Sequence, residues 1–136
     1  MKNYLLLPLA LFFLATTALA EDLAPLKVAG ASTIGTITAK MLFDKGFTFI
    51  DVRRAEDFSN GHIPGAKNLA VRGDNFTAEN LSAIAGKDQA VVFYCSGAIC
   101  MGSSIASEKA VQWGWSKVLY YREGFAKWKE AGLAVE

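Results

Sequence analysis

Cysteine and histidine are scarce in this chain of 136 residues, which has two cysteines and one histidine. Two cysteines are too few for a disulfide framework. A structural zinc site needs about four ligands, and His62 lies far along the sequence from both Cys95 and Cys100. We therefore expect neither a metal site nor another cofactor. Any cysteine chemistry must rest on Cys95 and Cys100 themselves.

The chain also lacks an excess of charge of either sign, with 14 lysines and arginines against 13 acidic residues. A balanced chain gives no reason to expect binding to nucleic acid or to an anionic membrane surface. There is no internal repeat, low-complexity run or long linker that would divide the sequence. Length and continuity together indicate one domain with enough residues for a buried core.

A long hydrophobic run occurs only at the N-terminus. Lys2 provides a positive start, residues 5–15 are apolar, and Ala18-Leu19-Ala20 offers the small residues that signal peptidase reads. The run is shorter than the ~20 residues of a spanning helix, which favours a cleaved signal over residues 1–20 rather than a membrane anchor. We expect residues 21–136 to form a secreted domain, in the bacterial periplasm, with no membrane attachment after cleavage. Its cysteines then face an oxidising compartment.

Short apolar runs alternate with helix-like segments along the rest of the chain. Strands are predicted over 47–52, 66–71, 90–94 and 117–121, and helices over 55–60, 77–86, 103–113 and 125–131. We expect Thr77 to cap the second of these helices, and Ser103 or Ser104 to cap the third. The continuous apolar run at 90–94 is typical of a buried central strand. The alternation predicts an α/β fold with a parallel sheet covered on both faces.

Ligands bind such sheets outside the carboxyl ends of the strands, and Cys95 directly follows the predicted central strand. It opens a loop that leads to the next helix: Ser96, Gly97, Ala98, Ile99, Cys100 and Met101. A loop between a strand end and a helix N-terminus directs backbone N–H groups toward its centre. This setting favours the thiolate form of a cysteine. Cys95 is thus a candidate nucleophile, and the structural alternative is a small buried hydrophobic residue.

Several motifs in order along the chain resemble those of the rhodanese family. They are Ile50-Asp51-Val52-Arg53 with Glu56, Gly61-His62-Ile63-Pro64-Gly65-Ala66, Asn68-Leu69, Val92-Phe93-Tyr94-Cys95, then Ser104, Ala106 and Gly114, and finally Tyr120-Tyr121 with Gly124 and Trp128. The resemblance implies a three-layer sandwich with a five-stranded parallel sheet. It also implies a sulfurtransferase whose Cys95 thiolate takes a sulfane sulfur from a small donor as a persulfide. The sulfur then passes to a thiol, a protein or another nucleophilic acceptor.

The loop departs from the family pattern at two positions. Many sulfurtransferases have Arg or Lys five residues after the cysteine, where this chain has Cys100. The related phosphatases have Arg six residues after it, where this chain has Met101, which argues against phosphatase or arsenate reductase chemistry. Cys100 either lines the loop or attacks the Cys95 persulfide and closes a disulfide. The alternative to an enzyme is a non-catalytic or redox module that binds a partner and carries Cys95 and Cys100 as a disulfide pair.

The four arginines, Arg53, Arg54, Arg72 and Arg122, each follow the end of a predicted strand. The guanidinium fork suits oxyanions, so we expect Arg72 or Arg122 to supply the positive charge that the loop lacks and to bind the donor. Arg53 is expected to pair with Glu56 or Asp57.

Three further residue types have structural interpretations. Asp51 is expected to support the loop or to pair locally. His62 is expected to order the turn before Pro64 rather than to act as a base. The three tryptophans are expected to pack in the core rather than to form a binding box.

Overall fold

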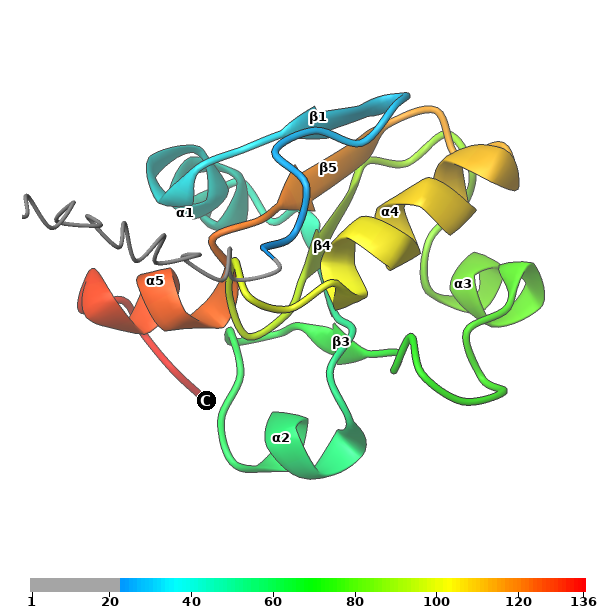
Figure 1. Cartoon of the computed structure of the whole chain (residues 1–136). Coiled ribbons are helices and arrows are strands. Elements are labelled where there is room, and N and C mark those ends of the chain that lie inside the picture. Colours follow the sequence, from blue (N-terminus) through cyan, green and yellow to red (C-terminus); the bar gives the residue numbers. More distant parts are fainter. Residues whose placement is uncertain (1–22) are drawn as a thin grey trace, which may run out of the picture.

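A computed structural model describes residues 23–136, so the signal segment predicted over residues 1–20 lies outside the described part and stays a prediction. The strands are β1 (Ala31–Thr33), β2 (Thr48–Asp51), β3 (Lys67–Asn68), β4 (Val91–Tyr94) and β5 (Val118–Tyr121). They form one five-stranded sheet in the order β1-β5-β4-β2-β3, and all neighbours are parallel (Figure 1). The predicted α/β class and the central place of β4 are confirmed.

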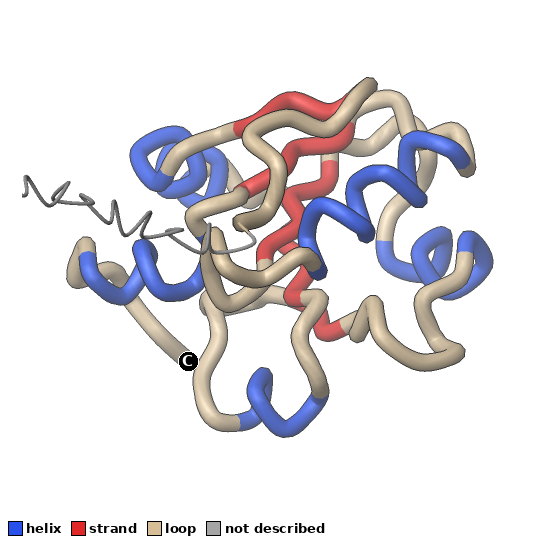
Figure 2. The backbone as a smooth tube through the Cα atoms, in the orientation of Figure 1, coloured by secondary structure: helices blue, strands red, loops and turns tan. Residues whose placement is uncertain are grey.

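Helices cover both faces of this sheet (Figures 1 and 2). The helices α1 (Thr36–Asp44) and α5 (Gly124–Glu130) lie on one face, and α3 (Ala78–Ile84) and α4 (Gly102–Gln112) lie on the other. The short α2 (Ala55–Ser59) connects β2 to β3 beyond the carboxyl ends of the strands. Within residues 23–136 no helix has both the length and the apolar character needed to cross a membrane.

Two hydrophobic clusters join these layers. Beside α1 and α5, the ring of Phe43 meets Trp128 and Phe49 edge to face, with centroids 5.3 Å and 6.2 Å away. On the other face, Ala106 and Ala110 of α4 are fully buried, and their small side chains let the helix lie close to the sheet. Close packing of this kind fixes where α4 begins relative to the end of β4, and Cys95 lies between these two points.

Several predicted boundaries require correction. The helix α4 begins at Gly102 with Met101 as its N-cap, so the prediction of a cap at Ser103 or Ser104 is wrong. The hydroxyl of Ser104 instead donates back to the carbonyl of Met101, because the chain has already turned into helical geometry there. Thr77 does cap α3 and accepts a hydrogen bond from the Asn80 amide at 3.1 Å. The strand predicted over 66–71 is reduced to the two residues of β3.

The sequence-based prediction also missed β1 and α1. The Gly35 N-cap of α1 offers no side chain to the helix. The first turn is held instead by the carboxylate of Glu123, which accepts from the Thr36 amide at 2.9 Å and from its hydroxyl at 2.6 Å. A cap that comes from 87 residues along the chain leaves no local signal.

Candidate functional site

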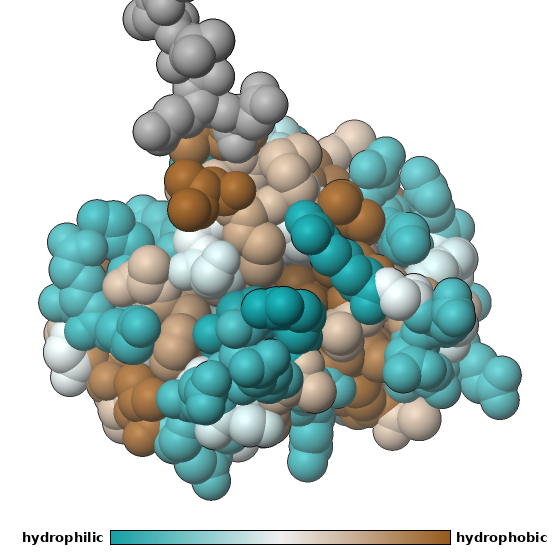
Figure 3. All heavy atoms as spheres, turned by 60° about the horizontal axis from the view of Figure 1, so that its bottom comes forward, coloured by the Kyte–Doolittle hydropathy of each residue, from teal (hydrophilic) through white to brown (hydrophobic). Residues whose placement is uncertain are grey.

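A pocket of about 380 Å³ opens at the carboxyl ends of β2 and β4. Its lining residues come from the chain after β2, from α2, from the chain after β3, and from the loop that joins β4 to the start of α4: Val52, Arg53, Arg54, Asp57, Ala70, Val71, Arg72, Cys95, Ser96, Cys100 and Gly102. Figure 3 shows the face of the molecule that lies at the bottom of Figure 1. Hydrophilic side chains gather there around smaller hydrophobic areas. The pocket lies where a parallel sheet is expected to bind ligands.

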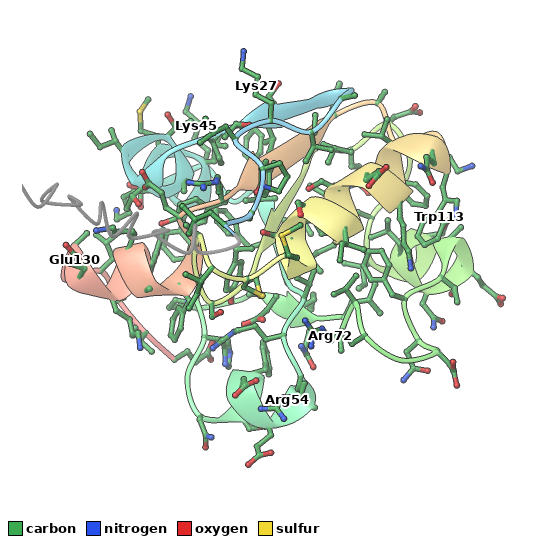
Figure 4. The ribbon with its side chains drawn as sticks, viewed as in Figure 1. Lys27, Lys45, Arg54, Arg72, Trp113 and Glu130 are labelled. Carbon is green, nitrogen blue, oxygen red and sulfur yellow. A yellow bond between two sulfur atoms is a disulfide. The ribbon has the colours of Figure 1, made fainter. Side chains whose placement is uncertain are left out.

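Cys95 and Cys100 form a disulfide in this pocket, drawn as a yellow bond in Figure 4. Their Cα atoms are 6.2 Å apart, which is inside the range that disulfides span. The loop returns on itself because the Cys100 amide donates to the carbonyl of Gly97 at 3.0 Å. The Cys95 residue is only 4% exposed. The structure therefore brings the two predicted thiols together, although the sequence left their relation open.

The start of α5 holds the first part of the loop. The amide of Phe125 donates to the Cys95 carbonyl at 3.0 Å, and that of Ala126 donates to the Ser96 carbonyl at 2.8 Å. Gly124 has a φ of +62° and lies so close that an added Cβ would be 2.5 Å from the Cys95 carbonyl oxygen. Only glycine permits both this backbone conformation and this approach.

The N-terminal lead holds the second part of the loop. The amide of Ala24 donates to the Ala98 carbonyl at 2.8 Å. Two side chains fix the lead in turn. The Arg122 Nε donates to the Ala24 carbonyl at 2.9 Å, and the Tyr120 hydroxyl donates to the Pro25 carbonyl at 2.8 Å. Arg122 is absent from the pocket lining, so the structure gives it a loop-supporting position instead of the predicted donor-binding one.

The first residue of α4 packs directly on the disulfide. A Cβ added to Gly102 would lie 3.2 Å from the Cys95 Sγ and 3.4 Å from the Cys100 Sγ. The first N–H groups of a helix have no partner within it, and the helix dipole places partial positive charge at this end. The site thus offers a favourable environment for negative charge on either sulfur. Ile99 and Met101, by contrast, are exposed and do not line the pocket.

A buried ion pair between Asp51 and Arg53 adjoins the pocket, because Arg53 is one of the lining residues. Asp51 is fully buried and accepts from the Arg53 amide at 2.9 Å and from its Nη2 at 2.7 Å. Arg53 therefore pairs with Asp51, and the predicted pairing with Glu56 or Asp57 is wrong, because the side chain folds back over the strand end toward the carboxylate that is already buried there. Burial by itself would lower the pKa of Arg53, but the hydrogen bond and charge of Asp51 outweigh it and raise that pKa. Burial, together with the charge of Asp51, also raises the pKa of Tyr94, which keeps its phenol neutral.

The remaining two pocket arginines differ in their partners. The Arg54 Nε lies 3.2 Å from a carboxylate oxygen of Asp57. Arg72 makes no side-chain hydrogen bond or ion pair with the residues of the described segment, 23–136. Figure 4 shows Arg54 at the start of α2 and Arg72 beyond β3, on the same side of the molecule. Arg72 is thus the pocket arginine whose charge is available to a ligand.

The histidine lies outside this pocket. The His62 Nδ1 is 2.8 Å from the Phe58 carbonyl oxygen, and the two rings stack with centroids 3.7 Å apart. Its backbone exchanges two hydrogen bonds with Glu136. His62 thus orders the turn before Pro64, as its sequence context indicated. Trp115 and Trp128 are buried in the core, also as expected. Within residues 23–136 no group of three or more potential ligands is arranged to hold a metal ion.

The fold and the site together define an α/β domain with a cysteine-containing loop between its central strand and a helix. The sequence model of the rhodanese-like domain matches residues 36–131. The chain therefore belongs to the rhodanese-like domain family, as the motifs predicted.

The chain is also similar to individual proteins of known sequence or structure. The chain is 34% identical over 134 residues to the HTH-type transcriptional regulator Rv0324 of Mycobacterium tuberculosis, covering 93% of this chain but only 57% of the regulator. The BH2092 protein of Bacillus halodurans has a TM-score of 0.68 at 26% identity, over 77% of this chain and 76% of that one. A thiosulfate sulfurtransferase from Pseudomonas aeruginosa has a TM-score of 0.61 at 20% identity, over 78% of this chain and 20% of that one, and shares the fold.

Proposed function

We propose that the chain is a sulfurtransferase that takes up sulfane sulfur as a persulfide on Cys95. The observation that carries this proposal is the position of the Cys95 sulfur, in the lining of a pocket and against the first residue of α4. In the reduced protein, the helix N-terminus favours the thiolate, which is the attacking form. The same groups stabilise the negative charge of the persulfide after the donor has left.

The uptake of sulfur by the reduced protein tests this proposal. The protein is reduced, freed of reductant, mixed with glutathione persulfide and then removed by ultrafiltration, and the sulfane sulfur left in the filtrate is measured by cyanolysis. We expect each chain to remove one sulfane sulfur in the first turnover, because Cys95 is the single acceptor. Protein alkylated beforehand with iodoacetamide serves as the control and should remove none. No uptake by the reduced protein would contradict the proposal.

The donor is proposed to be anionic because Arg72 lines the pocket without a partner among the described residues. We expect Arg72→Ala to lower kcat/KM for glutathione persulfide about ten- to a hundredfold, the loss expected for one charge-assisted hydrogen bond. The value for a neutral organic trisulfide should stay unchanged. Added salt should narrow the difference between wild type and variant by screening the wild type.

Arg54→Ala is the matched control for this prediction. Arg54 also lines the pocket, but its charge is paired with Asp57, so its removal should have the smaller effect. Equal losses with the anionic and the neutral donor would refute an anion-binding role for Arg72.

The disulfide between Cys95 and Cys100 favours a second candidate function, a thiol–disulfide redox module that binds a partner. Such a module exchanges its disulfide with thiols of the partner and takes no sulfur from a sulfane donor. The mass of Cys100→Ser after reaction with glutathione persulfide separates the two functions, because only a sulfurtransferase gains the mass of one sulfur atom on Cys95, whereas a redox module forms a mixed disulfide with glutathione and releases sulfide.

A further inference from the structure

We propose that Cys100 is a resolving thiol that makes this site release its sulfur as hydrogen sulfide. This inference rests on the Cys95 persulfide proposed above. Cys100 attacks the persulfide, hydrogen sulfide leaves, and the disulfide seen in the structure remains. A dithiol reductant then reopens the disulfide. The site thus reduces sulfane sulfur to sulfide, and its second substrate is a dithiol.

The loop holds the two cysteines at bonding distance by contacts that do not involve sulfur. Four backbone hydrogen bonds fix it: Phe125 to Cys95, Ala126 to Ser96, Cys100 to Gly97, and Ala24 to Ala98. Their partners belong to α5, to the N-terminal lead and to the loop itself. Because none of these bonds depends on the disulfide, the Cα separation of 6.2 Å is expected to persist when both thiols are reduced.

The position of Cys100 gives it an advantage over acceptors from solution. Cys95 is only 4% exposed, so an external acceptor must enter the pocket to reach the persulfide. Cys100 already lines that pocket. Attack within one chain avoids the loss of translational freedom that a second molecule incurs. Gly102 at the start of α4 lies against both sulfurs, so the helix N-terminus favours negative charge on either of them.

The steps balance in atoms and electrons. The Cys95 thiolate attacks the outer sulfur of the donor R–S–SH, the donor S–S bond breaks, and RSH leaves after taking up a proton. The Cys100 thiolate then attacks the Cys95 Sγ, the bond from Sγ to the outer sulfur breaks, and that sulfur leaves as HS⁻. The two cysteines lose two electrons and the sulfane sulfur gains them. A dithiol returns these electrons through a mixed disulfide. One donor persulfide and one dithiol therefore yield RSH, hydrogen sulfide and an oxidised dithiol.

A single-turnover experiment tests the resolving step. Wild type and Cys100→Ser are reduced, freed of reductant and mixed with one equivalent of glutathione persulfide. Released sulfide and the intact protein mass are then followed in time. We expect wild type to release one sulfide per chain and to lose the mass of two hydrogens as the disulfide closes. Cys100→Ser should keep one extra sulfur atom on Cys95 and release sulfide at least about tenfold more slowly, because it lacks the intramolecular attack.

Three further outcomes are informative. Cys100→Ser should still form thiocyanate when cyanide is added, which shows that it is folded and carries the sulfur. If wild type accumulates the persulfide and keeps Cys100 as a free thiol, the resolving role is overturned while the sulfurtransferase proposal stands. If neither protein takes up sulfur, the proposed function itself fails.

Discussion

Cys95→Ser is expected to abolish sulfur uptake from glutathione persulfide, with a loss of at least about 10³-fold, as for other essential nucleophiles. Serine has nearly the size of cysteine, but its hydroxyl is a much weaker nucleophile at neutral pH. It also cannot form a persulfide, which requires a sulfur atom at this position. Position 95 lines the pocket and is the proposed point of sulfur attachment. The measurement is the rate of donor consumption at saturating enzyme, compared with wild type under the same conditions.

Cys100→Ser is the matched control, because it also removes a thiol and the disulfide but leaves the proposed nucleophile. It should consume the donor in its first turnover at a rate close to that of wild type. Urea unfolding in reducing buffer should place Cys95→Ser within about 1–2 kcal/mol of wild type, as is usual for a conservative change of this size. Donor consumption by a folded Cys95→Ser at the wild-type rate would remove Cys95 from the mechanism.

Local sequence signals accounted for the centre of the site. The run 90–94 is apolar at every position, and all four residues of β4 are buried in the structure. A strand of that kind lies in the middle of a parallel sheet, which places the following residue, Cys95, at the carboxyl edge. The order of a strand, a loop that contains glycine and a helix along the sequence is then enough to predict where the site lies. Thr77 is a similar case, since its cap on α3 depends on a residue only three positions away.

Contacts between distant parts of the chain account for what the sequence did not predict. The lead around Ala24 contacts the loop at Ala98, and Arg122 binds the lead rather than a ligand. The approach of Cys100 to Cys95 depends partly on these contacts and on α5. A spacing of five residues therefore left the disulfide undecided, because an open loop and a closed one share the same sequence pattern.

The partners of the arginines also could not be predicted from the sequence. Arg122 directly follows β5, and Arg53 and Arg54 come soon after β2, but Arg72 lies beyond the short β3 and not directly after a strand. The strand ends alone also do not say which carboxylate each guanidinium reaches. Arg53 folds back to Asp51 and donates also to the Gly61 carbonyl at 2.7 Å. Its guanidinium carbon lies 4.5 Å from the centre of the Phe125 ring. These partners come from β2, the turn after α2 and α5, so the pairing follows from the folded arrangement.

The pairing of Arg53 with Asp51 carries the second large expected effect: Asp51→Ala should lower the free energy of unfolding by about 3–5 kcal/mol. Asp51 is fully buried, and the Arg53 side chain is only 10% exposed. Loss of the carboxylate leaves a buried guanidinium beside Phe125 without its counter-charge. The cost is that of an uncompensated charge, which is larger than the net contribution of the pair. Urea unfolding in reducing buffer measures it without interference from the disulfide.

Two comparisons identify the cause of that loss. Lys40→Ala, which breaks the exposed Lys40–Asp44 pair, should cost less than about 0.5 kcal/mol, because its side chains are 38% and 55% exposed. The double variant Asp51→Leu/Arg53→Met should be more stable than Asp51→Ala alone, since it leaves no unpaired charge and keeps the buried volume. If Asp51→Ala unfolds within about 1 kcal/mol of wild type, loss of the counter-charge of Arg53 does not destabilise the fold as expected. If the double variant is as unstable as Asp51→Ala, the cost comes from lost packing rather than from the charge that Asp51 neutralises.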